Sequence, residues 1–327
     1  MTDFTKFIKR VIILLVIVII LLLIINQLYI KIILEKQRLP RNQRQFIEYK
    51  TNNDLKVIVI GDSLPAFAVN PAYLNNSFNL ATPAENFEQM YYKVKWLVNN
   101  EPDIEIYVIQ YNYHSFNYYR IKPYYFTTYW KNFMSYDELS YAKDSPKSTI
   151  FFEVLIPVIG KGEEIVKYIR DWKDLRDPKR KRWLTTKIEN GWINDDTVFP
   201  EDQENTTKVA ENRVYNQFSN YPIVREEVYT EIFFDTLKLL KDNNKKVVLI
   251  QYPLTDEYLT ALERDINIHE EYKEIDERIE SFDYKILDYY ETFRHNQTLF
   301  VDSDHLNFEG AEIFTKLLYK DILTLSP

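Results

Sequence analysis

The stretch Val57-Ile58-Val59-Ile60-Gly61-Asp62-Ser63-Leu64 indicates the fold class of this 327-residue chain. Four consecutive β-branched residues are typical of a short strand that is buried in a parallel sheet. The Gly-Asp-Ser sequence that follows favours a tight turn, because all three residue types adopt turn conformations readily. A serine on such a turn can point its hydroxyl into a cleft at the end of the strand.

A second segment near the C-terminus, Asp302-Ser303-Asp304-His305, contains the partners that a reactive serine needs. His305 can take the proton of the Ser63 hydroxyl, and Asp302 can hold the imidazole in the tautomer that accepts it. Each segment alone is a weak signal, since turns and helix starts often contain these residue types. Together they predict a nucleophilic serine enzyme with a catalytic triad of Ser63, His305 and Asp302.

Apolar runs and helical spacings alternate along most of the chain. The predicted strands cover residues 56–60, 78–80, 105–110, 246–251 and 285–289, and the predicted helices cover 85–99, 226–241, 269–281 and 308–323. This alternation predicts an α/β fold with a parallel sheet and right-handed crossovers. Active sites in such sheets lie at the carboxyl ends of the strands, which is where Ser63 and Asn112 fall.

The middle of the chain, about residues 115–225, lacks this alternation. It is rich in aromatic residues, and we expect it to be a mostly helical or irregular insertion in the sheet domain. Its basic run Lys179-Arg180-Lys181-Arg182 is expected to be a solvated face. The alternative is that this run lies near anionic lipid headgroups or an acidic polymer.

Residues 1–30 are predicted to be an uncleaved transmembrane anchor. Val11 to Ile25 are fifteen unbroken aliphatic residues, and with their apolar neighbours up to residue 30 they approach the roughly 20 residues that span a bilayer. Lys6, Lys9 and Arg10 precede the run and place the N-terminus in the cytoplasm. A cleaved signal peptide is the alternative, but residues 26–31 offer no small-residue cleavage pattern. We expect residues 31–55 to form a polar stalk and residues 56–327 to form a domain outside the cytoplasm.

The composition excludes several classes of protein. The net charge of −8 and the isoelectric point of about 5.3 argue against nucleic acid as a partner, whose binding needs a basic surface. The chain has no cysteine, so disulfides, thiolate metal sites and cysteine nucleophiles are excluded. Its four histidines, His114, His269, His295 and His305, are not paired at metal-ligand spacing on one helix turn. We therefore predict neither a metal nor a cofactor.

The two quoted segments resemble sequence blocks of the SGNH hydrolase superfamily, whose serine members carry a Gly-Asp-Ser-Leu signature and a final Asp-x-x-His block. Residues 61–64 match the signature letter for letter, and Asp302 with His305 matches the final block. Of the Gly-x-Asn-Asp block only Asn112 is present, and residues 79–84 lack the glycine of the remaining block. The resemblance covers roughly residues 55–115 and 245–325, and it implies a flavodoxin-like five-stranded parallel sheet.

The resemblance also implies an oxyanion hole. Its donors would be the backbone N–H of Ser63, the backbone N–H of Ala81 and the side chain of Asn112.

Two further groups are candidates for substrate contacts on their residue types. His114 follows Asn112 closely and either contacts substrate or is a hydrogen-bonded structural histidine. The aromatic cluster of Tyr124, Tyr125, Tyr129 and Trp130 either stacks on sugar faces or packs in a core.

A membrane-anchored domain of this kind is similar to accessory proteins of cell-envelope polymer acylation, such as the alginate O-acetylation and teichoic-acid D-alanylation proteins. This resemblance implies a serine O-acyltransferase or acyl esterase that acts on a cell-envelope glycan, with a membrane-bound acyltransferase as a partner. The alternative is a non-catalytic domain that binds glycan or scaffolds such an acyltransferase. The glycine-free block favours the alternative, and the intact Ser-His-Asp set opposes it.

Overall fold

The computed structural model describes residues 3–52, 54–117, 125–173, 186–199, 203–219 and 227–324. The chain forms two compact units. Residues 1–41 and 125–185 make up the helical unit, and residues 42–124 and 186–327 make up the sheet unit. The serine and histidine segments singled out above both belong to the sheet unit. The basic run at residues 179–182 lies outside the described residues.

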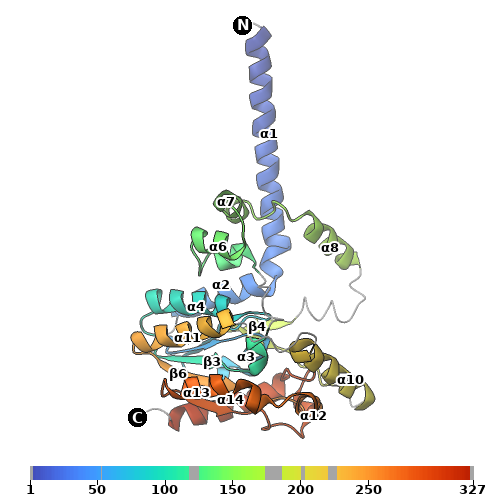
Figure 1. The fold of residues 1–327 in the computed structure, drawn as a ribbon. Coiled ribbons are helices and arrows are strands. Elements are labelled where there is room, and N and C mark those ends of the chain that lie inside the picture. The colour runs from blue at the N-terminus through green and yellow to red at the C-terminus, as the bar shows by residue number, and fades with distance from the viewer. Residues whose placement is uncertain are drawn as a thin grey trace. The chain divides into compact units, whose positions relative to one another are not determined.

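A five-stranded parallel sheet forms the centre of the sheet unit (Figure 1). Its strands are ordered β2 (Ser77–Asn79), β1 (Val57–Ile60), β3 (Ile106–Gln110), β6 (Lys246–Gln251) and β7 (Lys285–Asp288). Neighbouring strands pair in parallel throughout, and the order is that of flavodoxin-like sheets. The predicted fold class is confirmed, and each predicted strand agrees with an observed one to within one residue at either end.

Helices cover both faces of this sheet, which explains why its strands are apolar at nearly every position. On one face an apolar cluster joins the strands to α3 (Ser63–Ala68) and α14 (Phe308–Thr324), and it includes Val59, Val108, Leu64 and Phe314. On the other face α4 (Phe87–Asn100) and α11 (Glu227–Asp242) lie side by side (Figure 1). The rings of Phe87 and Phe233 join these two helices, with centroids 4.9 Å apart.

The other elements of the sheet unit surround this core. They are α2 (Arg38–Asn52), α10 (Gln203–Val214), the π-helical turn η5 (Tyr215–Ser219), α12 (Asp256–Asp265), α13 (Ile268–Glu280) and the 3-10 turns η2 (Pro71–Tyr73), η3 (Tyr113–Phe116) and η6 (Gln297–Leu299).

Helix α2 occupies much of the segment for which we expected a polar stalk, residues 31–55. From Asn42 onward the helix belongs to the sheet unit. Phe46 is only 1% exposed, and its ring packs edge-on against Phe78 of β2 and Trp96 of α4. The buried positions Leu39, Asn42 and Phe46 recur at helical spacing. A helix with so narrow a buried strip looks polar in sequence.

A short antiparallel hairpin, β4 (Lys187–Glu189) and β5 (Trp192–Asn194), is an element that our sequence reading missed. Its turn residues Asn190 and Gly191 have φ angles of +48° and +86°, as a tight two-residue hairpin turn requires. The turn lies against the end of β2, where the Asn79 N–H donates to the Asn190 carbonyl at 3.0 Å. A Cβ on Gly191 would lie 1.6 Å from the Asn79 oxygen, so this contact requires glycine.

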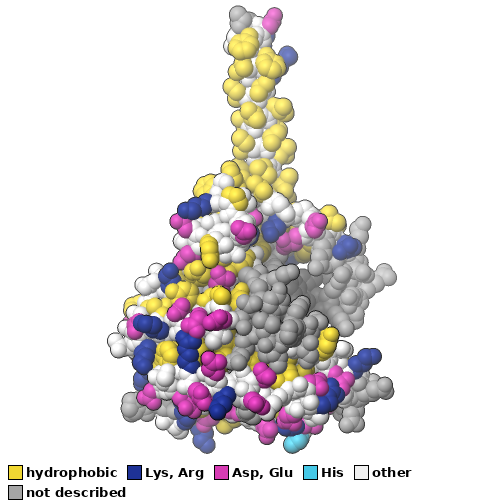
Figure 2. Space-filling model, in the orientation of Figure 1, with side chains coloured by type: hydrophobic (Ala, Val, Ile, Leu, Met, Phe, Trp, Pro, Cys, Tyr) yellow, Lys and Arg dark blue, Asp and Glu magenta, His cyan; other side chains and the backbone are white. Residues whose placement is uncertain are grey.

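The helical unit contains α1 (Asp3–Ile32), η1 (Leu34–Lys36), α5 (Thr127–Trp130), α6 (Tyr136–Ala142), α7 (Lys147–Leu155) and α8 (Gly162–Lys173). Helix α1 is long and apolar enough to cross a membrane. Figure 2 shows its apolar side chains exposed along most of its length. The predicted apolar N-terminal helix is therefore present, whereas its orientation in a membrane stays a prediction.

Candidate active site

Ser63 is the first residue of α3 and follows the carboxyl end of β1. Asp62 caps the helix, because its Oδ1 accepts a hydrogen bond from the Leu64 N–H at 2.9 Å. The Asp62 N–H donates at 2.7 Å to the side-chain Oε1 of Gln110, the last residue of β3. These bonds tie the serine turn to two neighbouring strands and limit where its hydroxyl can point.

Gly61 leaves room for this turn. A Cβ at this position would lie 2.5 Å from the Pro65 Cγ and 2.6 Å from the Gln110 Oε1. Both distances are far inside van der Waals contact, so a side chain here would displace Pro65 of α3 and the side chain of Gln110. Sterics explain the glycine of the Gly-Asp-Ser sequence, and helix capping explains the aspartate.

His305 lies on the loop between β7 and α14, which backbone hydrogen bonds fold back on itself. The Val301 N–H donates to the His305 carbonyl at 2.8 Å, and the Asn307 N–H donates to the Leu299 carbonyl at 2.9 Å. The Asp302 Oδ1 also accepts the backbone N–H of His305 at 3.0 Å. The loop therefore fixes the Asp302 carboxylate and the His305 ring relative to each other.

The structure brings Ser63, His305 and Asp302 into one hydrogen-bonded line. The His305 Nε2 lies 2.8 Å from the Ser63 Oγ, and Nδ1 lies 2.8 and 3.0 Å from the two Asp302 oxygens. The ring of Phe67 packs on the imidazole, with centroids 4.9 Å apart, and limits its rotation. When Nδ1 donates its proton to Asp302, Nε2 is free to accept the serine proton.

A second carboxylate and an arginine flank this line. The Asp304 Oδ1 lies 3.5 Å from the His305 Nδ1, and its side chain is almost fully buried. Arg213 of α10 places Nε 3.1 Å from Asp304 Oδ1 and Nη2 3.5 Å from Asp302 Oδ2. The guanidinium therefore offsets part of the negative charge of the two aspartates.

These charges shift the pKa values of the triad. Burial lowers the pKa of His305, but the charges of Asp302 and Asp304 outweigh burial and hold that pKa above its ordinary 6.5. Burial raises the pKa of Asp302, yet His305 and Arg213 together bring that pKa well below its ordinary 3.8. Asp302 is therefore ionised throughout the physiological pH range, and His305 protonates more readily than a free histidine.

In the part of the chain that the structure describes, Asp302, Asp304 and His305 also form a group with metal-ligand atoms within 4.8 Å of one another. Arg213 lies against both carboxylates of this group. The Arg213 side chain therefore supplies a positive charge beside these two carboxylates.

The two predicted oxyanion donors beyond Ser63 are buried and already hydrogen-bonded. The Ala81 N–H donates to the Asn79 Oδ1 at 3.1 Å. The Asn112 Oδ1 accepts the Tyr252 N–H at 3.3 Å, and the Asn112 side chain also hydrogen-bonds the Tyr290 hydroxyl. An oxyanion would have to replace the Asn79 oxygen at the Ala81 N–H, whereas the bond from Tyr252 uses the Asn112 oxygen and not its amide N–H donors. The role of Ala81 and Asn112 as donors stays a proposal.

The candidate substrate residues lie in different surroundings. The His114 Nε2 lies 3.0 Å from the Asp62 Oδ2, and both side chains are buried. His114 therefore braces the serine turn, as in the structural alternative. Trp130 belongs to the helical unit, where it is fully buried and packs edge-on against Tyr129. Its ring offers no open face to a sugar. Tyr124 lies outside the described residues.

A buried ion pair supports the loop that carries Ala81. The Lys93 Nζ of α4 donates to the Leu80 carbonyl at 2.6 Å, the Thr82 Oγ1 at 2.6 Å and the Glu85 carboxylate at 2.8 Å. Both charged side chains are fully buried. Burial raises the pKa of Glu85 to about 7, against the opposing attraction of Lys93.

Sequence reasoning missed this pair and Arg213. Charged residues of a helical pattern are usually exposed, and no spacing relates residue 213 to residues 302–305. The hairpin of β4 and β5, which was also missed, did have a signal in the sequence, because Asn190-Gly191 strongly favours a tight hairpin turn.

Comparisons with known proteins complete the description of the site. No protein-family model matches the chain, and no curated protein matches its sequence. A proposed acylhydrolase of Bacteroides fragilis shows a TM-score of 0.40 at 11% identity, over 86% of this chain and 96% of that one. A GDSL-like lipase of Bacteroides thetaiotaomicron shows a TM-score of 0.41 at 11% identity, over 88% of this chain and 99% of that one. With similarity this low, the activity has to be inferred from the chain's own residues.

Proposed function

We propose that this chain is a membrane-anchored serine O-acyltransferase or acyl esterase that acts on a cell-envelope glycan. The hydrogen-bonded line of Ser63, His305 and Asp302 is the observation that carries the proposal. The resemblance of residues 61–64 and 302–305 to the SGNH blocks supports it. The apolar helix α1 supports the anchored location.

In the proposed reaction the Ser63 Oγ attacks the carbonyl carbon of an acyl donor while the His305 Nε2 takes its proton. The tetrahedral intermediate then collapses, the bond to the leaving alcohol breaks, and His305 returns the proton to that alcohol. A glycan hydroxyl, or water in the esterase case, attacks the acyl-serine by the same steps. Asp302 stabilises the imidazolium that forms in each half-reaction.

The location and partners complete the proposal. Helix α1 crosses the cytoplasmic membrane with its N-terminus inside, and the sheet unit acts outside the cytoplasm. A membrane-bound acyltransferase hands the acyl group to Ser63, and the envelope glycan accepts it. The excess of Lys6, Lys9 and Arg10 at the start of α1 supports this orientation.

Covalent labelling tests the proposal directly. A fluorophosphonate incubated with the full chain in detergent should add to Ser63, as measured by intact mass and peptide mapping. Ser63→Ala should abolish the adduct, and His305→Ala should slow its formation strongly because the hydroxyl loses its base. His295→Ala is the matched control, since His295 is an exposed histidine outside the site, and it should label at the wild-type rate.

A chromogenic acetyl ester gives the second readout, because an acetyl-enzyme on Ser63 should be seen by the same mass analysis. If the wild-type chain stays unlabelled where a control serine esterase reacts, and no acyl-enzyme forms with any activated ester, the enzyme proposal is wrong.

A non-catalytic glycan-binding or scaffold domain is the second candidate, and one observation favours it. The Ala81 N–H already donates to the Asn79 side chain, so one of the predicted oxyanion donors is engaged by another protein group. This candidate predicts no covalent adduct and a glycan affinity that Ser63→Ala leaves unchanged.

A further inference from the structure

Helix α1 changes its surroundings part-way along its length. Its apolar side chains from Ile12 to Ile25 are mostly about half exposed on all sides. Asn26, the next residue, and Tyr29, three residues beyond it, are only 4% and 3% exposed. The cover comes from the helical unit itself. The Val158 N–H donates to the Asn26 Oδ1 at 3.1 Å, and the Tyr29 hydroxyl donates to the Glu164 carboxylate at 3.1 Å.

The part of α1 that is exposed on all sides, Val11 to Ile25, is too short to cross a bilayer alone. Fifteen residues, Val11 to Ile25, extend over about 22 Å of helix, whereas the hydrocarbon layer is about 30 Å thick. With Arg10 at one boundary, roughly five further residues must lie at hydrocarbon depth. Among those residues, 26–30, Asn26 and Tyr29 are covered by α8 and by the connection between α7 and α8, while Leu28 on another side of the helix is 52% exposed. These elements therefore reach the membrane as well.

The surface of α7, α8 and their connection is apolar enough for that position. Six large apolar side chains on these elements are between 41% and 63% exposed, namely Phe151, Phe152, Leu155, Ile159, Val166 and Ile169. Scattered exposed apolar residues are common, but a gathered set of large ones marks a protein or membrane contact. In this case they adjoin a helix that is itself suited to lipid.

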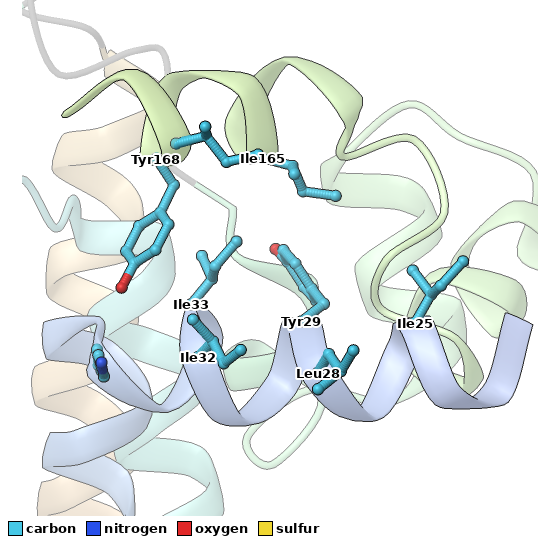
Figure 3. Close-up of a pocket in the computed structure, with 9 residues that line it drawn as sticks. Ile25, Leu28, Tyr29, Ile32, Ile33, Ile165 and Tyr168 are labelled. Carbon is cyan, nitrogen blue, oxygen red and sulfur yellow. The ribbon is translucent and has the colours of Figure 1, made fainter. Parts of the chain in front are cut away.

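A cavity of about 440 Å³ between α1 and α8 continues this surface (Figure 3). Its wall consists of Ile25, Leu28, Tyr29, Ile32 and Ile33 from α1 and its end, and Ile165, Tyr168 and Ile169 from α8, with Lys36 beside them. The wall is almost entirely apolar, which suits a hydrocarbon chain and not a glycan. The Lys36 ammonium supplies a positive charge near the cavity for a phosphate headgroup.

We propose that α7, α8 and residues 25–33, at the end of α1 and just after it, form a lipid-embedded surface, in which the cavity between α1 and α8 holds an acyl chain of a membrane phospholipid. The proposal rests on the membrane anchoring proposed above, but not on the catalytic triad.

Site-directed spin labelling tests this proposal cleanly, because the chain has no native cysteine. Single variants Val166→Cys and Ile169→Cys are labelled with a nitroxide in the full chain, reconstituted in nanodiscs of phosphatidylcholine and phosphatidylglycerol. Val228→Cys on α11 is the matched control, since Val166 and Val228 are both 63% exposed. Ile17→Cys, in the middle of the apolar run, reports on the anchor.

Accessibility to oxygen, which partitions into lipid, is compared with accessibility to a water-soluble nickel chelate. The labels at Val166 and Ile169 should be several-fold more accessible to oxygen and several-fold less accessible to nickel than the label at Val228. If Ile17 is lipid-exposed but Val166 and Ile169 behave like Val228, this inference is overturned while the proposed function stands. Shielding of Val166 from both reagents means that a protein covers the surface, which also overturns it. A water-exposed Ile17 overturns the anchor itself.

Discussion

At the scale of single residues, the two aspartates beside His305 differ in their hold on the imidazole. Asp302 contacts Nδ1 with both carboxylate oxygens, at 2.8 and 3.0 Å. Asp304 lies 3.5 Å from the same nitrogen and makes its closer contacts with Arg213, at 3.1 Å, and Gln217, at 3.4 Å. Geometry therefore assigns the control of the tautomer to Asp302 and only a longer-range charge effect to Asp304.

Isosteric substitution of each aspartate separates these roles. Asp302→Asn should slow fluorophosphonate labelling of Ser63 by about 10³–10⁴-fold, because the imidazole loses the partner that selects its tautomer. Asp304→Asn should change it by about tenfold or less, since only a charge effect on the pKa of His305 is lost. The measurement is the second-order labelling rate at neutral pH. Equal losses in the two variants would show that the assignment is wrong.

The raised pKa of His305 predicts the pH dependence of the same reaction. Only the neutral imidazole can accept the serine proton, so labelling should rise with pH and reach half its maximum above pH 6.5. The charge of Arg213 lowers the pKa of His305, so Arg213→Met should move the midpoint higher still. Arg264→Met is the control, because Arg264 pairs with Asp265 and Glu211 on the surface. A midpoint that moves down in Arg213→Met would contradict the prediction.

At the scale of elements, the hairpin of β4 and β5 stabilises the side of the site that carries the serine. The Trp192 Nε1–H donates to the Phe67 carbonyl at 2.7 Å, and the Phe67 ring packs on His305. Ile188 and Ile193 of the hairpin also share an apolar cluster with Ala81. The hairpin thus connects to α3, to His305 and to the loop after β2.

Gly191→Ala tests the close approach of this hairpin to β2. Gly160→Ala is the matched control, because both glycines have positive φ, +86° and +74°, but a Cβ on Gly160 meets nothing within 4 Å. The control should cost about 1–2 kcal/mol of stability from backbone strain. Gly191→Ala should cost about 3 kcal/mol or more, since the Asn79 carbonyl must also move. Denaturant unfolding followed by tryptophan fluorescence gives both values, and equal costs would argue against the close contact. Labelling of Ser63 should slow only in Gly191→Ala.

At the scale of the whole molecule, the order of basic and apolar residues at the N-terminus predicts the orientation of the proposed membrane anchor. Lys6, Lys9 and Arg10 stand before the fifteen aliphatic residues of α1. Basic flanks stay in the cytoplasm because their translocation is unfavourable. In the proposed topology the remainder of the chain follows α1 to the other side.

Reporter fusions measure this orientation. A reporter that is active only outside the cytoplasm should give signal when it is fused after Pro327, and a cytoplasm-only reporter fused there should be silent. The same two reporters fused before Met1 should give the opposite result. Activity of the cytoplasm-only reporter after Pro327 would refute the proposed topology.

Local residue patterns were sufficient to predict the parallel sheet and the candidate triad. The five strands were predicted to within a residue, because a strand buried on both faces is a continuous apolar run such as Val57–Ile60. The turn chemistry of Gly61 and Asp62 depends on immediate neighbours, and so does the three-residue separation of Asp302 from His305. Such features are legible in sequence because the interacting residues are close along the chain or follow a fixed period.

Only the tertiary structure decided the surroundings of the site. Arg213 meets Asp302 and Asp304 across a separation of some ninety residues. Phe46 is buried although it belongs to a polar segment, because β2 and α4 cover it. Burial and long-range charge contacts arise when separate elements pack together, and no local pattern of residue types encodes which elements will meet.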